Sequence, residues 1–130
     1  MISIENKKRI LVKYSEKIDS FLYCQFTKQN SIFTLTDLKG NVKIVFSNKM
    51  NEFKNSKSKT KFATQNTAQE ISKKATLLGY KNLVVILKGK NKGRKRCVRF
   101  IKKGGLEISK IIDKTFIIHN GCRPQKEPRL

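Results

Sequence analysis

The run Leu83-Val84-Val85-Ile86-Leu87 constrains the fold of this chain more than any other segment. Its residues are apolar without a break, and turn-forming residues bound the run on both sides. A strand with one solvated face alternates polar and apolar residues, so an unbroken run is typical of a strand covered on both faces. Such strands belong to parallel sheets, whose crossover connections are usually helices. The run therefore predicts an α/β protein.

Helical patterns stand on both sides of this strand. Before it, apolar residues recur at spacings of three, four and three: Ala68, Ile71, Ala75 and Leu78. Thr60 suits the N-cap of this first helix, and Gly79 suits the position just after its end. After the strand, residues 94–103 are predicted as a second helix that ends at a pair of glycines.

The remaining strands are predicted from shorter patterns. Residues 20–26, 32–36 and 42–46 are joined by turns short enough for antiparallel hairpins, and residues 106–113 form a last strand. In the third strand, alternation places Val42, Ile44 and Phe46 on one face. Three hairpin strands followed by helix, strand, helix and strand predict a mixed sheet with helices packed on it.

The sequence also predicts how the chain is divided. Residues 1–18 are expected to be an N-terminal extension, residues 19–116 a single α/β domain, and residues 117–130 a basic tail. Two prolines and many charges keep the tail from building a core of its own. An ordered tail therefore requires an outside partner.

The net charge of +21, from 30 basic and 9 acidic residues, indicates the nature of that partner. Residues 1–53 contribute nine Lys/Arg and five Asp/Glu, a net of +4, which leaves +17 for residues 54–130. Self-repulsion on this scale destabilises a compact monomer, so nucleic acid is the expected partner. No apolar run approaches the roughly 18–20 residues that span a membrane, so no membrane partner is expected. Three widely spaced cysteines without a Cys-x-x-Cys pattern favour a reducing compartment.

Three segments are candidates for RNA contact. Residues 88–103 contain nine Lys/Arg and no acid, and their glycines lie where a buried strand meets a helix N-terminus, a place that attracts phosphate. The candidates there are Lys88, Gly89, Lys90, Lys92, Gly93, Arg94 and Arg96. The loop before the first helix adds Lys54, Lys57, Lys59 and Lys61. The tail adds His119, Asn120, Gly121, Arg123, Lys126 and Arg129.

Other chemistries are weaker readings of the same residues. The glycine spacing in residues 88–103 differs from a Walker A motif, so neither a nucleotide nor another small-molecule substrate is expected. His119 and Cys122 lack a second ligand pair, and no metal or other cofactor is expected. Asp19, Asp37 and Asp113 lie at strand ends and leave a metal-dependent nuclease as an alternative. Phe21, Tyr23, Phe26 and Phe33 suit core packing better than base stacking.

The ordered motifs of the chain resemble the universal small-subunit ribosomal protein eleven family from about residue 19 to residue 126. The motifs that carry the resemblance are Ile32-Phe33-Thr34-Leu35-Thr36-Asp37, Thr60-Lys61-Phe62-Ala63-Thr64-Gln65, Gly89 with Gly93-Arg94, Ile111-Ile112-Asp113-Lys114-Thr115 and His119-Asn120-Gly121-Cys122-Arg123-Pro124. The resemblance implies a three-layer α/β/α fold with a mixed five-stranded sheet, like ribonuclease H in topology but without its catalytic carboxylates.

The same resemblance implies a structural role without catalysis. Members of the family bind small-subunit rRNA and neighbouring proteins on the platform, near the mRNA exit and the exit-site tRNA. A free nucleic-acid-binding protein remains an alternative outside the family. The loop before the first helix has fewer glycines than the family pattern, and the family usually has another glycine near Asn91.

The composition favours an organelle as the site of function. Lys outnumbers Arg by 24 to 6, a bias typical of an AT-rich genome. The first residues lack a signal-peptide core and make a poor transit peptide. A mitochondrion that makes the protein itself is therefore expected, with a plastid or a bacterial cytoplasm as alternatives.

Overall fold

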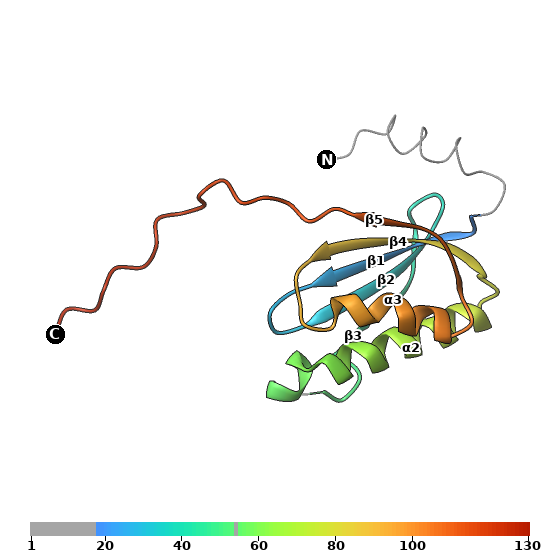
Figure 1. The fold of residues 1–130 in the computed structure, drawn as a ribbon, viewed down its shortest axis with the longest axis horizontal. Helices are drawn as coiled ribbons and strands as arrows, with labels where there is room; N and C mark the ends of the chain where they lie inside the picture. The colour runs from blue at the N-terminus through green and yellow to red at the C-terminus, as the bar shows by residue number, and fades with distance from the viewer. Residues whose placement is uncertain (1–17, 54) are drawn as a thin grey trace.

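The computed structural model describes residues 18–53 and 55–130, and shows a five-stranded sheet with two α-helices packed on it (Figure 1). The strands are β1 (Ser20–Phe26), β2 (Ser31–Asp37), β3 (Val42–Ser47), β4 (Asn82–Gly89) and β5 (Glu107–Asp113). The helices are the 3-10 helix η1 (Asn55–Lys59), α2 (Lys61–Leu77) and α3 (Arg94–Lys103). The α/β class with a mixed five-stranded sheet is confirmed.

The strand order is β3-β2-β1-β4-β5, so β1 is the central strand. It pairs antiparallel with β2 and parallel with β4, and β4 pairs parallel with β5. The five apolar residues of β4 are all buried, as the unbroken run predicts. Leu83, Val85 and Leu87 face the helices, while Val84 and Ile86 belong to a cluster on the opposite face.

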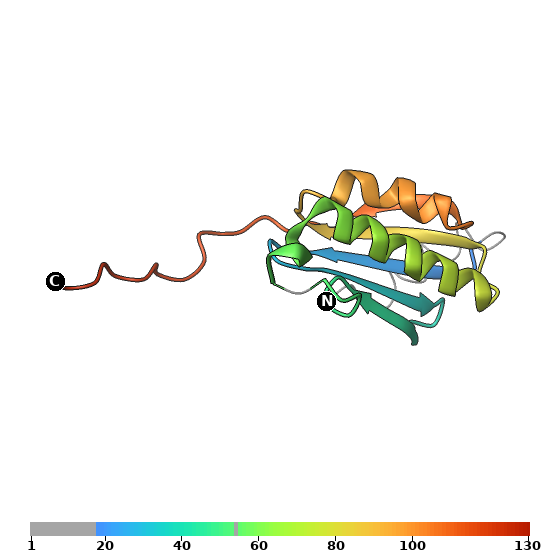
Figure 2. The same cartoon turned by 90° about the horizontal axis from the view of Figure 1, so that it is seen from below.

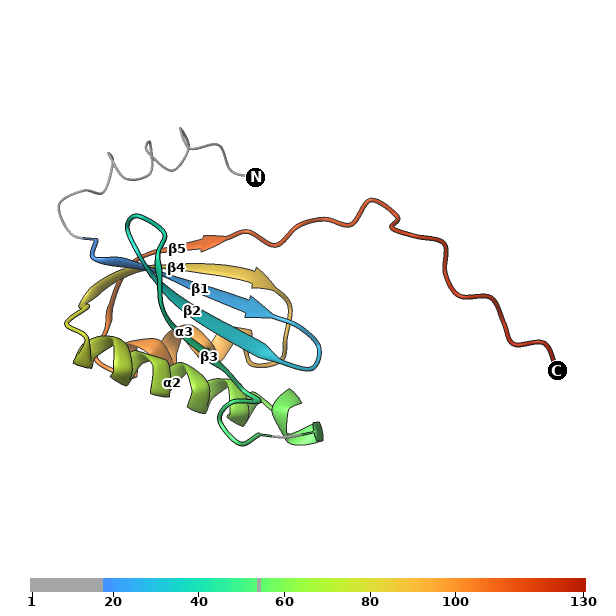
Figure 3. The same cartoon turned by 180° about the vertical axis from the view of Figure 1, so that it is seen from behind.

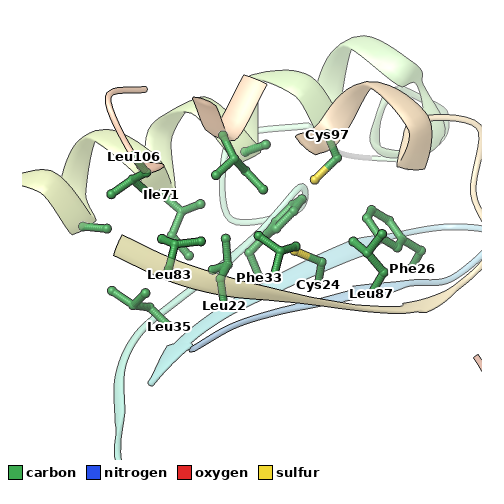
Figure 4. Close-up of a cluster of buried hydrophobic side chains, with 14 residues drawn as sticks. Leu22, Cys24, Phe26, Phe33, Leu35, Ile71, Leu83, Leu87, Cys97 and Leu106 are labelled. Carbon is green, nitrogen blue, oxygen red and sulfur yellow. The ribbon is translucent and has the colours of Figure 1, made fainter. Parts of the chain in front are cut away.

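Both α-helices cover the same face of the sheet (Figure 2). Between them and the sheet lies the main core, where Phe33, Leu22 and Leu35 from the hairpin meet Ile71 of α2 and Ile101 of α3 (Figure 4). The part of the chain that the structure describes therefore has two layers. The third layer that the resemblance implies is not among these residues.

Local signals place the ends of α2 as expected. The hydroxyl of Thr60 accepts a hydrogen bond from the backbone N–H of Ala63 at 3.2 Å, which is an N-cap contact. Gly79 follows the helix with φ of +89°, and the N–H groups of Gly79 and Tyr80 bond back to Thr76 and Ala75. These two hydrogen bonds form a Schellman motif, which favours glycine at its left-handed position.

One expectation about β3 is wrong. Leu35 pairs with Ile44, but the next residue of β2, Thr36, pairs with Val42, so Lys43 is an extra residue in a β-bulge. The bulge breaks the alternation, and Val42 is 58% exposed while Ile44 and Phe46 pack partly against the core.

The aromatic residues of the first hairpin divide between the two faces. Phe26 and Phe33 are buried and meet edge to face at 6.1 Å, so their predicted packing in the core is confirmed. Phe21 and Tyr23 are half-buried in the cluster on the other face, beside Val84 and Ile86.

The chain after β5 contains no helix or strand, and residues 116–130 are exposed throughout. None of the helices in the described residues is long and apolar enough to cross a membrane. The cysteines Cys24 and Cys97 are buried and Cys122 is exposed, and all three are free. Burial, followed by the neighbouring Cys97, raises the pKa of the Cys24 thiol well above its usual value, so this thiol stays protonated.

A candidate RNA interface at one edge of the sheet

The topology brings most of the predicted basic residues to the edge of the sheet at which the carboxyl ends of its parallel strands lie. Strands β1, β3, β4 and β5 end at this edge, and α2 and α3 begin there (Figures 1 and 2). We define the basic edge by its exposed cations: Lys28, Lys57, Lys59, Lys61, Lys88, Lys90, Lys92, Lys95 and Arg96. The tail leaves the sheet at the same end of the molecule (Figure 3).

Buried polar contacts hold the loops of the basic edge together. The Asn48 side chain is fully buried, and its amide donates to the Ser58 carbonyl at 2.9 Å and to the Thr64 hydroxyl at 3.2 Å. The Ser58 hydroxyl donates to the carbonyl of Gln29 at 2.9 Å. The loop between β3 and α2 is therefore fixed to both the first hairpin and α2.

Asn91 connects the turn between β4 and α3 to the first hairpin. Its side-chain amide donates to the Thr27 carbonyl at 3.0 Å and to the Ser31 hydroxyl at 3.2 Å. A glycine at this position has no side chain to make these bonds. Asn91 thus anchors the turn to the first hairpin.

The two predicted glycines of this turn have packing roles. Gly89 has φ of +90°, and a Cβ there would lie 2.1 Å from the carbonyl oxygen of Phe26. A Cβ on Gly93 would lie 2.6 Å from the Cβ of Thr64 on α2. The glycines allow close approach of protein to protein, which is a different reason from the approach to phosphate that the sequence suggested.

Arg94 also differs from expectation, because its guanidinium bonds inside the protein. Its Nη1 donates to the Gly89 carbonyl at 2.6 Å and to the Thr115 hydroxyl at 3.1 Å, and its Nη2 forms an ion pair with Asp113. The side chain is only 20% exposed. Arg94 therefore joins the β4–α3 turn to the start of the tail, and its contact with RNA stays a prediction.

Asp113 is the acceptor at the centre of this junction. The hydroxyl and the backbone N–H of Thr115 donate to it, and together with Arg94 they lower the pKa of the Asp113 carboxyl to about 2. The carboxylate is thus ionised throughout the physiological range, which keeps the junction intact.

The positive end of each α-helix points to the basic edge. The first-turn N–H groups of a helix lack intrahelical acceptors and carry partial positive charge. Neither α2 nor α3 has an acidic residue in its first turn, and both begin with basic residues there. The helix ends and the side chains therefore attract a polyanion at the same place.

Acidic residues lie at the opposite edge. Asp19 precedes β1 and accepts from the backbone N–H of Asn82 at 2.9 Å. Asp37 ends β2, where Tyr80 donates to it at 2.5 Å and Lys43 lies 3.0 Å away; these two contacts lower the pKa of the Asp37 carboxyl. Glu107 begins β5. These three acidic residues therefore lie away from the basic edge, at the end of the sheet that also carries Lys39, Lys43 and Lys81.

The length of the sheet separates the residues of the nuclease alternative. Asp37 pairs with the start of β1, whereas Asp113 lies across from Leu87 at the other end of the sheet. Within residues 18–53 and 55–130, no three His, Cys, Asp or Glu side chains are placed to hold a metal ion.

The remaining predicted site residues lie in the tail or outside the residues that the structure describes. His119, Asn120, Gly121, Arg123, Lys126 and Arg129 are exposed in the tail, and Lys54 lies outside the described residues. Asn120 and Gly121 both have φ of +65°, so the chain turns sharply at these two residues of the tail. Lys28 joins the edge only in three dimensions, whereas Lys95 belongs to the charge run of residues 88–103; neither was among the predicted contact residues.

Taken together, these features define an α/β protein with a mixed five-stranded sheet and a strongly cationic edge. Residues 21–129 match the family model described as ribosomal protein S11. The chain belongs to the ribosomal protein S11 family.

Named relatives agree with this assignment. The small ribosomal subunit protein uS11m of Prototheca wickerhamii is 38% identical over 95% of this chain and 97% of its own length. The uS11m of Marchantia polymorpha is 44% identical over 78% of this chain and 81% of its own length. The uS11 of Buchnera aphidicola is 36% identical over 95% of this chain and 93% of its own length.

Proposed function

We propose that this chain is a structural constituent of the small ribosomal subunit, and that its basic edge and tail bind small-subunit rRNA. The observation that carries the proposal is the gathering of nine exposed cations and two helix N-termini on one edge of the sheet. Family membership supplies the identity of the polyanion. A chain with this role needs no catalytic activity, and we assign it none.

The finer proposals follow from the family resemblance. The protein lies on the platform of the subunit, close to the mRNA exit and the exit-site tRNA, and contacts neighbouring platform proteins. Lys57, Lys59 and Lys61 of the loop and Lys88, Lys90, Lys92 and Arg96 of the turn contact phosphates. The tail, from His119 to Arg129, extends away from the sheet into the rRNA. Residues 19–116 form the folded domain that carries the basic edge and from which the tail extends.

The proposed compartment is the mitochondrion. Two uS11m relatives support it, and so does the excess of Lys over Arg, which is typical of an AT-rich genome. The bacterial relative is 36% identical to this chain, nearly as much as the uS11m of Prototheca wickerhamii. Fractionation of source cells tests this directly, because the protein must then sediment with organellar small subunits.

The RNA interface is tested by a pair of variants with equal charge. One replaces Lys90, Lys92 and Arg96 with Gln, and the control replaces Lys39, Lys81 and Lys102 with Gln at exposed positions away from the basic edge. Tagged proteins are expressed in source cells, and co-sedimentation with small subunits on sucrose gradients is measured. The first variant should be depleted from the subunit peak and the control should not. Equal incorporation of the two variants would refute the proposed interface.

A further inference from the structure

Phe62 is an aromatic side chain that the core does not use. It is the second residue of α2, and 67% of its surface is exposed. Its neighbours Ala63 and Thr64 are buried, so the helix turns Phe62 away from the sheet. A ring that stays in water contributes little to folding. Its exposure is therefore a feature of the surface that a partner could use.

The ring is held in place by a second aromatic residue. The centroids of Phe53 and Phe62 are 6.0 Å apart, and the ring planes meet at 83°, an edge-to-face contact. Phe53 is half-buried and follows Glu52, whose φ of +63° is uncommon for a residue other than glycine. The loop that carries Phe53 is fixed by the buried amide of Asn48. A ring fixed in this way loses little conformational freedom when a partner covers it.

The surroundings of Phe62 are cationic. Lys57, Lys59 and Lys61 are exposed within five residues of it, and α2 has no acid in its first turn. The positive end of the α2 dipole adds to the attraction for an anion at this place. An aromatic ring among lysines is the combination with which proteins hold single-stranded nucleic acid, because the ring stacks on a base while the cations follow the phosphates.

We propose that Phe62 is a stacking platform for an unpaired RNA base, and that the basic edge binds single-stranded segments of RNA in addition to helical ones. This inference rests on the proposed RNA-binding function and deepens it. A base inside an A-form duplex is stacked on both sides and has no free face for the ring. Phe62 therefore selects for loops, bulges or ends, while the lysines bind either form.

The absence of tryptophan from this sequence allows a direct test. Phe62→Trp introduces a single tryptophan at the platform, which can be excited apart from the three tyrosines, and a stacked base quenches its emission. Leu77→Trp is the matched control, because Leu77 is 85% exposed on the same helix and lies about 22 Å farther along its axis. Each variant is titrated with a single-stranded oligoadenylate and with an RNA duplex of equal length, while fluorescence anisotropy of labelled RNA reports binding independently. Oligoadenylate is a suitable probe because stacking tolerates any base.

The expected result is strong quenching of Phe62→Trp by oligoadenylate, little quenching by the duplex, and little quenching of Leu77→Trp by either. Phe62→Ala should weaken the binding of oligoadenylate roughly 5- to 150-fold, with an unchanged thermal unfolding midpoint and nearly unchanged duplex binding. Binding of both RNAs without quenching of Phe62→Trp would overturn the stacking proposal and leave the RNA-binding function intact. A loss of protein contacts in the subunit without any change in RNA affinity would also overturn it, by assigning the ring to a protein partner. Failure of the unsubstituted chain to bind either RNA would overturn both proposals.

Discussion

Two glycines with the same backbone angle provide a test of the packing at the basic edge. Gly79 and Gly89 have φ of +89° and +90°, so replacement by alanine imposes the same backbone cost at both, about 1–2 kcal/mol. A Cβ on Gly79 meets nothing within 4 Å, whereas a Cβ on Gly89 lies 2.1 Å from the Phe26 carbonyl oxygen. The difference between the two variants therefore isolates the steric contact.

The steric contact at Gly89→Ala should cost a free energy of unfolding that can be estimated from its distance. Contacts of a real Cβ essentially never fall below 3.0 Å, so the paired strands β1 and β4 must separate by nearly 1 Å at Gly89→Ala. Overpacking of this kind costs about 1–3 kcal/mol. Gly89→Ala should thus lose about 1–3 kcal/mol more free energy of unfolding than Gly79→Ala, a difference of about 1 M in the urea midpoint.

The assay is urea unfolding followed by circular dichroism, in a sulfate buffer that screens the net charge of +21. RNA affinity is measured on the same samples under native conditions. Equal losses of stability for the two variants would refute the argument from close approach. Full stability of Gly89→Ala together with weaker RNA binding would restore the alternative, in which this glycine makes room for phosphate.

Three further predictions follow from the basic edge and its junction with the tail. Because the folded-state pKa of Asp113 is lowered to about 2, its contribution to stability is present above about pH 4 and disappears as the pH falls toward 2. The free energy of unfolding of Asp113→Asn, measured with urea across this range, should lack that part of the pH dependence. A pH profile identical to that of the wild type would argue against the junction. Replacing Lys90, Lys92 and Arg96 with Gln should lower the slope of log affinity against log salt by up to about 0.9 for each lost phosphate contact, whereas Arg94→Gln should lower stability more than it lowers the slope. Deleting residues 117–130, which are exposed throughout, should leave the thermal midpoint unchanged and reduce incorporation into small subunits; undiminished incorporation would show that the tail anchors nothing.

The parts of the fold that were predictable from sequence depend on local signals. The unbroken run of β4 identifies a buried parallel strand, and Thr60 and Gly79 mark the ends of α2 by hydrogen bonds to residues a few positions away. These features need only the preferences of neighbouring residues. The charge run of residues 88–103 likewise locates the candidate interface without knowledge of the fold.

The features that sequence did not reveal depend on residues far apart in the chain. Arg94 meets Asp113 across 19 positions, and Gly93 meets Thr64 across 29, so no local pattern marks either contact. The bulge at Lys43 shifts the register by one residue and removes Val42 from the face that alternation assigns to it. Phe62 was placed at the start of a helix correctly, but its exposure depends on how that helix packs on the sheet.

The central position of β1 has a consequence for the newly made chain. One edge of β1 is covered soon by β2, but its other edge pairs with β4, where Ser20 meets Leu83 after 62 intervening residues. Until β4 leaves the ribosome that synthesises it, the nascent hairpin presents an unpaired strand edge and half of a hydrophobic core. Such edges recruit other strands and promote aggregation. The strongly cationic residues 88–103 follow β4 directly, so the pairing of β1 and the basic edge are completed in the same short interval of synthesis.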